Sequence, residues 1–467
     1  MASEMPQRSG RAGLVAAVVV VVVALGLALT SVFAGGAIVN DLGLAGGQKT
    51  AWKNGTPQKA PPAVLAAMDA QAPVPTQGGV ASALQPLLSV PQLGPHITAS
   101  VVDVSTGQTI YSSEPDAAMT PASTTKLVTA AAALAARGPA YRIETRVVAG
   151  AQPGEVVLVA GGDPTLAVFP TSYYPGAARI DDLAKQVKEA LGGQAPTRVT
   201  YDVSIYTGSG TGPGWDADAT TGGSGAVMTP IMTEGGRQKQ QKYSQRYPKP
   251  DLQAAQAFAS ALGVPANAVA AGNAPSGAKE LGKVQSAPMA RMVEFMLQES
   301  DNVLADALAR QVALAKSQPA SFEGGAAATK SVLEGLGLPV TGYGLVDGSG
   351  FSRNDKLSPA LLTAVLAMAA RADRGDLHTI FSGLPVAAYS GTLATRFLKA
   401  DQGGSAAGLV RAKTGTLTGV NSLAGVVVDA DGRTLAFAFM ADQTTNADQA
   451  VVALDRVAAA LAACGCH

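Results

Sequence analysis

The stretch MTPASTTKLVTAAAAL, residues 119–134, carries the pattern from which the fold and the chemistry can be predicted. Ser123 and Lys126 stand three residues apart at its centre, and an alanine-rich apolar run follows. The run stops at Gly138 and Pro139, a pair of residues that terminates helices. The pattern therefore predicts an apolar helix that begins at the serine–lysine motif.

The spacing of Ser123 and Lys126 indicates a possible nucleophile and base, because residues three apart on a helix share a face. A serine hydroxyl needs an adjacent base, and a lysine is one only when burial or positive charge keeps it neutral. Free backbone N–H groups at a helix start also favour an oxyanion. Ser123 could instead simply cap the helix. A second Ser-x-x-Lys, residues 276–279, lies in a Gly/Pro loop and is interpreted as chance.

Two further motifs lie downstream. Ser300, Asp301 and Asn302 form a Ser-x-Asn element at the junction of two helical stretches, and residues 413–416 read Lys-Thr-Gly-Thr on an expected strand. A rival Ser-x-Asn at 352–354 lies in a Gly-rich loop, so the context favours Ser300. Ser-x-x-Lys, Ser-x-Asn and Lys-Thr-Gly in this order are typical of penicillin-binding proteins and class A β-lactamases.

The segments around these motifs predict a sheet assembled from both ends of the chain. HITASVVDVSTGQTIYSS, residues 96–113, has apolar alternation on both sides of a turn, as in a β-hairpin. Residues 421–441 predict two more strands, joined at Asp431-Gly432, and a helix is expected from about 447 to 463. With helices between the strand regions, the expected fold is α+β, an antiparallel sheet flanked by helices.

Residues 141–282 differ from the rest of the chain in composition and in their pattern of expected elements. Short strands alternate there with Gly-rich loops such as TGSGTGPGWDADATTGGSG, and two helical patches interrupt them. This composition predicts a large β-rich domain inserted between the first two motifs. In contrast, the methionine-rich stripe at 289–297 has helical spacing and is interpreted as core.

The N-terminus contains a candidate membrane segment. Arg8 and Arg11 precede about 21 apolar residues that begin at Leu14 and carry no charge, which is long enough to span a bilayer as a helix. The apolar core of a cleaved signal peptide is usually shorter, although VFA at 32–34 is an acceptable cleavage site. An uncleaved anchor with a cytoplasmic N-terminus is therefore expected, and a cleaved signal is the alternative. Either one exports the rest of the chain.

Charge and cysteine content exclude several classes of function. Lys+Arg and Asp+Glu both number 34 and no basic block occurs, so a nucleic-acid partner is not expected. The two cysteines, Cys464 and Cys466, adjoin His467 and could bind a metal or form a small disulfide. A structural zinc needs four ligands, so an exposed tail is expected, with no metal and no cofactor.

Five further segments carry a resemblance to a known family: AGGDPTL (160–166), GPGW (212–215), GLVDGSGFSRNDKLSP (344–359), SGTLATRF (390–397) and RAKTGTLTGVNSLAG (411–425). With them the chain resembles the serine-type D-alanyl-D-alanine carboxypeptidases/endopeptidases of the S13 peptidase family, the class C low-molecular-mass penicillin-binding proteins. The resemblance implies a β-lactamase/transpeptidase-like domain with a domain inserted between the first two motifs. The expected division is a cytoplasmic tail (1–12), a transmembrane anchor or signal peptide (13–37), an extracytoplasmic linker (38–92) with one short helix at 63–68, the penicillin-binding serine peptidase domain (93–140 and 283–467) and the inserted domain (141–282).

The resemblance also implies a mechanism of acyl transfer. Neutral Lys126 takes the proton of Ser123, which attacks the carbonyl of the penultimate D-alanine. Ser300 relays a proton to the leaving amine, while Lys413 sets the electrostatics and helps to keep Lys126 neutral by repulsion. The implied substrate-binding residues are Asn302, Thr414, Gly415 and Thr416, and the implied oxyanion hole is formed by the backbone N–H groups of Ser123 and Thr416.

The implied partners are peptidoglycan peptides that end in D-Ala-D-Ala, and β-lactam antibiotics as covalent inhibitors. Two alternatives stay open. A class A β-lactamase adds a glutamate for deacylation, typically in a Glu-x-x-x-Asn segment, and none occurs between Asn302 and Lys413. A non-catalytic wall-binding or sensor protein could share the fold, although all the expected catalytic side chains are present.

Overall fold

The computed structural model describes residues 72–467. The expected tail and anchor, and the linker up to residue 71 with its short helix, lie outside the described residues. Within 72–467, none of the helices combines the length and the apolar character that crossing a bilayer requires.

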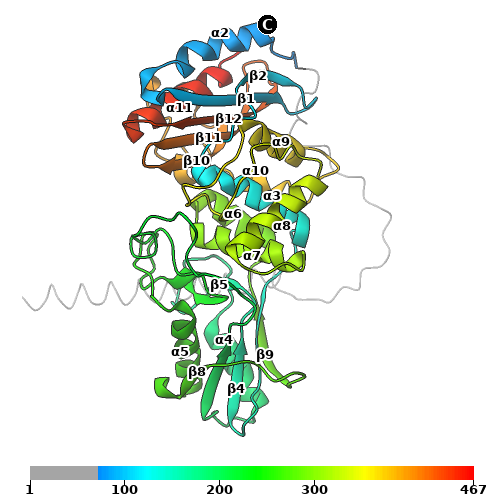
Figure 1. Cartoon of the computed structure of the whole chain (residues 1–467), viewed down its shortest axis with the longest axis vertical. Coiled ribbons are helices and arrows are strands. Elements are labelled where there is room, and N and C mark those ends of the chain that lie inside the picture. Colours follow the sequence, from blue (N-terminus) through cyan, green and yellow to red (C-terminus); the bar gives the residue numbers. More distant parts are fainter. Residues whose placement is uncertain (1–71) are drawn as a thin grey trace, which may run out of the picture. The chain divides into compact units, whose positions relative to one another are not determined.

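A five-stranded antiparallel sheet joins the two ends of the described chain, as predicted, in the order β10-β11-β12-β1-β2 (Figure 1). Strand β1 lies between β12 and β2, so that Val101 faces both Phe437 and Tyr111. Both expected hairpins are present, because β2 follows β1 and β12 follows β11 as antiparallel neighbours. The strands are β1 (His96–Asp103), β2 (Thr109–Ser113), β10 (Val410–Leu417), β11 (Val420–Val428) and β12 (Thr434–Asp442).

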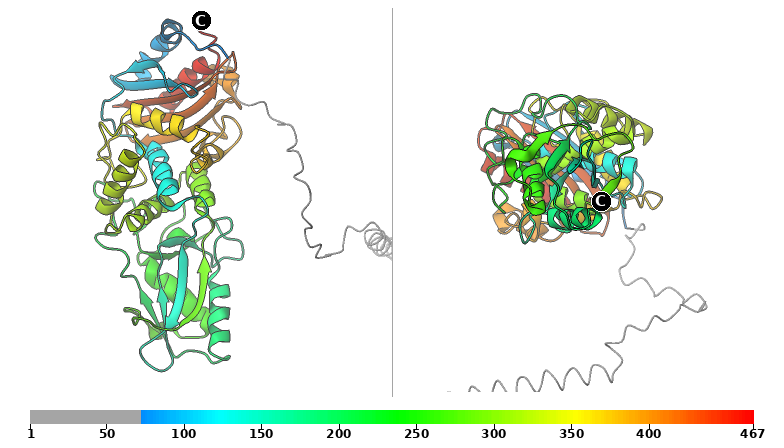
Figure 2. Two further views of the ribbon diagram at one scale, coloured as in Figure 1. Left: turned by 90° about the vertical axis from the view of Figure 1, so that its right-hand side faces the viewer. Right: turned by 90° about the horizontal axis from the view of Figure 1, so that it is seen from below.

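Strand β12 shows how the sheet separates two hydrophobic cores. Side chains alternate between the faces of a strand, so Phe437 and Phe439 join one apolar cluster while Ala438 and Met440 join the other. Helices α2 (Gln77–Leu88) and α11 (Ala447–Ala462) cover the phenylalanine face (Figure 2). The opposite face belongs to a cluster shared by α3 (Thr125–Arg137), α6 (Met289–Glu299), α7 (Asn302–Ala315), α8 (Phe322–Gly335), α9 (Pro359–Ala369) and the short α10 (Thr379–Gly383), of which α9 contacts β1, β11 and β12.

Helix α3 lies at the centre of this helical layer. Its residues 125–134 are all buried, because α7, α8, α6 and α9 contact it. Small alanine side chains let neighbouring helices approach on every side, so that even the polar Thr125, Lys126 and Thr129 are fully buried. The helix ends at Gly138, which has a φ of 80°, as the sequence predicts. The methionine stripe of α6 is buried in the same cluster and is part of the core.

Residues 144–285 contain a second sheet with the order β8-β6-β4-β3-β9. It mixes antiparallel pairs with the parallel pairs β4–β6 and β6–β8. Helices α4 (Ile180–Ala190) and α5 (Pro250–Leu262) share its hydrophobic cluster, which includes the fully buried Phe258. The strands are β3 (Glu144–Ala149), β4 (Glu155–Val159), β6 (Arg198–Asp202), β8 (Val269–Ala271) and β9 (Glu280–Gln285), and a small parallel pair joins β5 (Asp163–Leu166) to β7 (Ile231–Thr233). We propose that the segment expected at 141–282 is an inserted domain because it has its own sheet and core, and its last strand places its end at Gln285, three residues past the expected bound.

The structure corrects the C-terminal part of the predicted linker. Residues 77–88 form α2, and Val80, Leu84 and Leu88 are buried against the phenylalanine face of the sheet. These three residues repeat every four positions, which places them on one helix face. The region around these three residues is rich in Gly, Pro and Gln, and this composition led to the prediction of a linker.

The C-terminal tail is also corrected. Cys464 is 4% exposed and joins the same core, and a disulfide links it to Cys466. The backbone N–H of Thr76 donates to the carbonyl of Cys466 at 2.7 Å. A Cβ atom on Gly79 would lie 2.7 Å from that carbonyl oxygen, so glycine permits the close contact. The tail is therefore packed against the start of α2 through Cys464 and Cys466, and His467 at its end is exposed.

We expect Leu84→Ala to lower the free energy of unfolding of the full chain by about 2 to 5 kcal/mol, because it removes a fully buried side chain from the core. Chemical denaturation measures the change. Gln85→Ala, at the exposed neighbouring position of α2, is the control and should change the value by less than about 0.5 kcal/mol. Equal stability of the two variants would contradict the placement of α2 in the core.

Candidate active site

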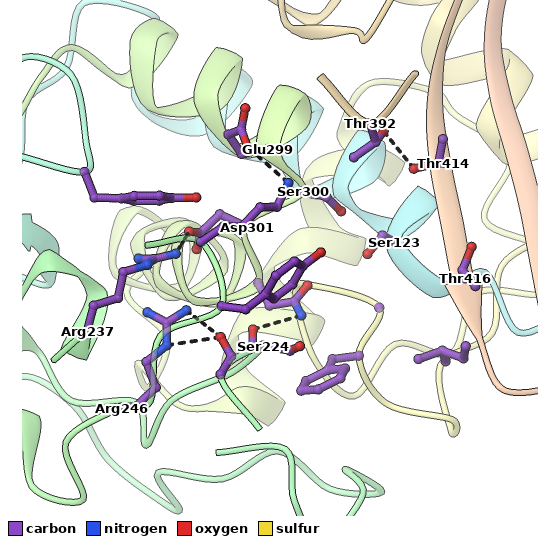
Figure 3. Close-up of a pocket in the computed structure, with 18 residues that line it drawn as sticks. Ser123, Ser224, Arg237, Arg246, Glu299, Ser300, Asp301, Thr392, Thr414 and Thr416 are labelled. Atoms are coloured by element: carbon purple, nitrogen blue, oxygen red, sulfur yellow. Dashed lines mark hydrogen bonds and ion pairs between the residues drawn. The ribbon is translucent and has the colours of Figure 1, made fainter. Parts of the chain in front are cut away.

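The first motif lies where a 3-10 turn, η2 (Ala122–Thr124), runs into α3. Ser123 is half-buried and lines a cavity of about 250 Å³, with residues of β10, the α6–α7 junction and the segment 223–246 around it (Figure 3). Ala122 precedes it with a φ of 48°, a left-handed conformation that costs a residue other than glycine about 1–3 kcal/mol. The strained turn directs the hydroxyl of Ser123 into the cavity.

Lys126 is fully buried one turn further along α3. Its Nζ lies 2.9 Å from Ser123 Oγ, 2.6 Å from Asn302 Oδ1 and 2.6 Å from the carbonyl oxygen of Ser349. A neutral amine has two N–H donors and one lone pair. The amide and the carbonyl accept the two hydrogens, so the lone pair is left for the hydroxyl of Ser123. This is the geometry of a general base and its nucleophile.

Burial also sets the protonation state of Lys126. It lowers the pKa of Lys126 to about 8, because the charged ammonium group is excluded from water. The negative charges of Asp306 and Asp347 oppose this shift, but burial is the larger effect. A substantial fraction of Lys126 is therefore neutral just above neutral pH.

The second motif joins α6 to α7. Ser300 ends α6 with a φ of 58°, and Asp301 caps α7 by accepting a hydrogen bond from the backbone N–H of Leu304 at 2.9 Å. Asn302 is the first residue of α7, and its amide nitrogen donates to the carbonyl of Ser224 at 3.2 Å. The amide is thus held from both ends, with its oxygen toward Lys126.

Lys413, in the third motif, lies beside the serine of the second. Its Nζ donates to Ser300 Oγ at 2.9 Å and to the carbonyl of Thr414 at 2.8 Å. Burial holds the pKa of Lys413 well below its usual value, and the charge of Lys126 lowers it further. Burial is the main cause of the lowered pKa of both lysines, and the repulsion between the two positive charges, which acts on both amines, adds to it.

Position 415 requires glycine for a structural reason that the sequence did not indicate. A Cβ atom at this position would lie 2.6 Å from the carbonyl oxygen of Pro121 and would collide with Ser422 Oγ. Glycine is therefore needed because β10 packs directly against the turn that carries Ser123. The neighbouring Thr414 and Thr416 line the cavity, and Thr414 Oγ1 lies 2.9 Å from Thr392 Oγ1 (Figure 3).

The structure brings all the predicted site residues together. Ser123, Ser300, Asn302, Thr414 and Thr416 line the cavity, and the two lysines lie behind it, hydrogen-bonded to the serines. The two rival motifs do not line this cavity. The first, Ser276, lines a different one. The second contains Ser352, which is buried and donates to the carbonyl of Pro213.

Several groups that contact the predicted site residues were not themselves predicted. The carbonyls of Ser349 and Ser224 orient Lys126 and Asn302, but a backbone atom leaves no residue-type signal in a sequence. Ser349 lies within GLVDGSGFSRNDKLSP, a segment that carried the family resemblance without an assigned role. Arg237 contacts Asp301 from a part of the insertion that lies outside the five resembling segments. Thr392 lies in SGTLATRF, another resembling segment.

Comparisons with known proteins show which sequences this chain resembles. The sequence profile of the D-Ala-D-Ala carboxypeptidase 3 (S13) family matches residues 80–246 and 229–461. Carboxypeptidase DacB of Mycolicibacterium smegmatis is 40% identical over 454 residues, which cover 95% of this chain and 97% of the relative. A carboxypeptidase of Mycobacterium tuberculosis is 39% identical over 90% of this chain and 92% of its own length.

The fold is shared with a solved structure. Penicillin-binding protein 4 (DacB) of Haemophilus influenzae superposes with a TM-score of 0.65 at 21% identity, over 81% of this chain and 97% of that one. The same protein has a structure in complex with a β-lactam, with a TM-score of 0.58 at 22% identity. The expected β-lactamase/transpeptidase-like fold is confirmed. The chain belongs to the D-Ala-D-Ala carboxypeptidase 3 (S13) family.

Proposed function

We propose that Ser123 is the nucleophile with which this member of the S13 family acts as a serine-type D-Ala-D-Ala carboxypeptidase. The observation that carries the proposal is the position of Lys126, whose two N–H groups have acceptors in Asn302 and Ser349 while its lone pair is left for Ser123. Activation of a serine by an adjacent base is the requirement for nucleophilic catalysis.

In the acylation step, Lys126 accepts the proton of Ser123 as Oγ bonds to the carbonyl carbon of the penultimate D-alanine. The oxyanion is stabilised by the backbone N–H groups of Ser123 and Thr416. Ser300, held by Lys413, then relays a proton to the nitrogen of the terminal D-alanine as the C–N bond breaks. Water hydrolyses the resulting ester and restores the hydroxyl of Ser123.

Substrate recognition is assigned to residues that surround Ser123. Thr414 and Thr416 bind the terminal carboxylate, and Asn302 binds the peptide group of the stem peptide. The 414–416 part of β10, an edge strand of its sheet, offers backbone groups along which an extended peptide can pair. The same residues can act on a D-alanyl cross-link, so we propose endopeptidase activity as well. β-Lactams acylate the same hydroxyl.

We propose that the folded part acts outside the cell membrane. The support is the apolar segment that begins at Leu14, which either anchors the chain or is removed as a signal peptide. N-terminal sequencing of the exported protein distinguishes the two: an intact start supports the anchor, and a start near Gly35 means cleavage.

Ser123→Ala should abolish labelling of the full chain by fluorescent penicillin, because no ester can form at an alanine. The measurement is in-gel fluorescence after incubation with excess label. Ser276→Ala, which alters the second Ser-x-x-Lys, is the matched control and should label like the wild type. Labelling that survives Ser123→Ala would overturn the assignment of the nucleophile.

The rate constant of acylation should rise with pH through a midpoint near pH 8 and level off about one pH unit above it. Lys126 must be neutral to accept a proton, and burial lowers its pKa to about 8, so the active form predominates above that pH. Stopped-flow measurements with a fluorescent penicillin between pH 6 and about 10 give the profile. A midpoint at the usual lysine pKa would contradict the proposed base.

D-Alanine should be released from a diacyl-Lys-D-Ala-D-Ala peptide, while bound penicillin leaves over a far longer time. The reason is the lack of the class A Glu-x-x-x-Asn segment that serves deacylation. D-Alanine release, muropeptide cleavage and penicilloate formation are followed in parallel. Rapid penicillin turnover with no peptide cleavage would favour the β-lactamase alternative, and no reaction with either would favour a non-catalytic protein.

A further inference from the structure

The middle residue of the second motif, Asp301, is held by an arginine from the proposed inserted domain. Arg237 Nη2 donates to Asp301 Oδ2 at 2.8 Å, and both side chains are only 2% exposed (Figure 3). The hydroxyl of Tyr174, also from that domain, donates to the same carboxylate oxygen at 3.1 Å. The other oxygen caps α7 through Leu304.

The donors of Arg237 are almost fully used within the protein. Nη1 donates to the hydroxyl of Tyr174 at 2.7 Å and to the carbonyl of Glu234 at 3.1 Å, and Nε donates to the carbonyl of Gln241 at 3.2 Å. With the bond to Asp301, these contacts occupy four of the five N–H groups of a guanidinium. The guanidinium also stacks on Tyr173, 3.8 Å from the ring centroid. Arg237 is therefore arranged to hold protein groups, although it borders the cavity.

The bond also keeps Asp301 charged. Burial alone would raise the pKa of Asp301, but the charges of Arg237 and Arg246 lower it to about 2. A buried ion pair is costly to break, because removal of one partner leaves an uncompensated buried charge. Without Arg237, that charge would stand between two reactive residues and close to Lys126, whose protonated form it favours.

Asp301 is bonded in sequence to both functional residues of the motif. Ser300 has a left-handed φ of 58°, and its Oγ lies 2.9 Å from Lys413 Nζ. Asn302 places its Oδ1 2.6 Å from Lys126 Nζ. Because the peptide units on each side of Asp301 are short and rigid, the anchoring of its carboxylate restricts where both neighbours can point.

Two other contacts from the same inserted region also hold residues that support Lys126. The carbonyl of Ser224 accepts from the amide of Asn302 at 3.2 Å. Trp215 Nε1 donates at 2.8 Å to Asp347, whose carboxylate accepts from the backbone N–H of Ser349, the residue that binds Lys126. The inserted region thus contacts the supports of Lys126 from two sides.

We propose that Arg237 is a positioning residue for acylation: by clamping Asp301, it places Ser300 against Lys413 and Asn302 against Lys126. The inserted domain thereby completes the active site of the peptidase domain. The inference rests on the proposed role of Ser123 but is separable from it. Ser123→Ala tests whether an acyl-enzyme forms there at all, whereas the clamp concerns how fast it forms.

The test compares full-length Arg237→Met with a matched variant, Arg433→Met. Arg433 also forms a buried ion pair, with Asp103 at 2.8 Å, but neither residue lines the cavity. We expect Arg237→Met to lower the acylation rate constant and kcat on the peptide about 100-fold, as for a misplacement of about 1 Å, with KM within about 3-fold. Arg433→Met should lose thermal stability yet acylate within about 3-fold of wild type.

Two further measurements exclude a purely structural role. Exogenous methylguanidinium should restore acylation by Arg237→Ala, in which a cavity replaces the guanidinium, but not by Arg237→Met. The double variant Arg237→Met/Asp301→Asn should acylate faster than Arg237→Met alone, because it removes the uncompensated charge. If Arg237→Met does not fold, the double variant and Arg237→Lys provide the comparison.

Three results would overturn the proposal: a rise in KM with kcat unchanged, which would make Arg237 a substrate ligand; equal kinetic losses in Arg237→Met and Arg433→Met; or a double variant that acylates no faster than Arg237→Met. In each case wild-type labelling at Ser123 would still stand. Penicillin labelling that survives Ser123→Ala would instead contradict the proposed function.

Discussion

The burial of Lys126 is the constraint on which the site depends. A lysine excluded from water must satisfy its N–H groups within the protein, and it keeps a lone pair only when the cost of burying the ammonium form outweighs the nearby negative charges that favour it. Here the three polar partners are a hydroxyl, an amide oxygen and a backbone carbonyl, and none is a carboxylate. They come from the turn before α3, the start of α7 and the loop at 347–352, so this set of contacts to Lys126 exists only while the three segments keep their relative positions.

The central sheet fixes the relative positions of these segments. The pairing of β1 with β12 unites the two ends of the described chain, and cores on both faces hold the sheet between α2 and α11 on one side and α3 with its neighbours on the other. Strand β10 is thereby pressed against the turn at Pro121, a contact that leaves no room for a side chain at residue 415. The close approach brings the third motif to Ser123, the proposed nucleophile. From the other side, the inserted region contacts Asp301, Asn302 and Asp347.

Much of this could be predicted where the local pattern is strong. The hairpin at 96–113, the strands at 421–441 and the helix that stops at Gly138 follow from period-two alternation, turn residues and a helix terminator, which act over a few residues. Helix α2 was missed because its apolar residues are sparse among Gly, Pro and Gln, and only contact with the sheet makes them core. The C-terminal cysteines were taken as an exposed tail because nothing local shows that the tail returns to the start of α2. The carbonyls of Ser224 and Ser349 were beyond any residue-based reasoning.

By itself the sequence determined the family to which the chain belongs, and it predicted the side chains proposed to carry the chemistry and the order in which they occur, since these depend on residue identity and short spacing. Tertiary structure alone decided how the side chains act. The pKa of Lys126 depends on its burial, Gly415 is required by the proximity of Pro121, and the charge of Asp301 is balanced by an arginine 64 positions earlier in the chain. Desolvation, steric contact and ion pairing operate between atoms that are close in space, so residues distant in the chain set them.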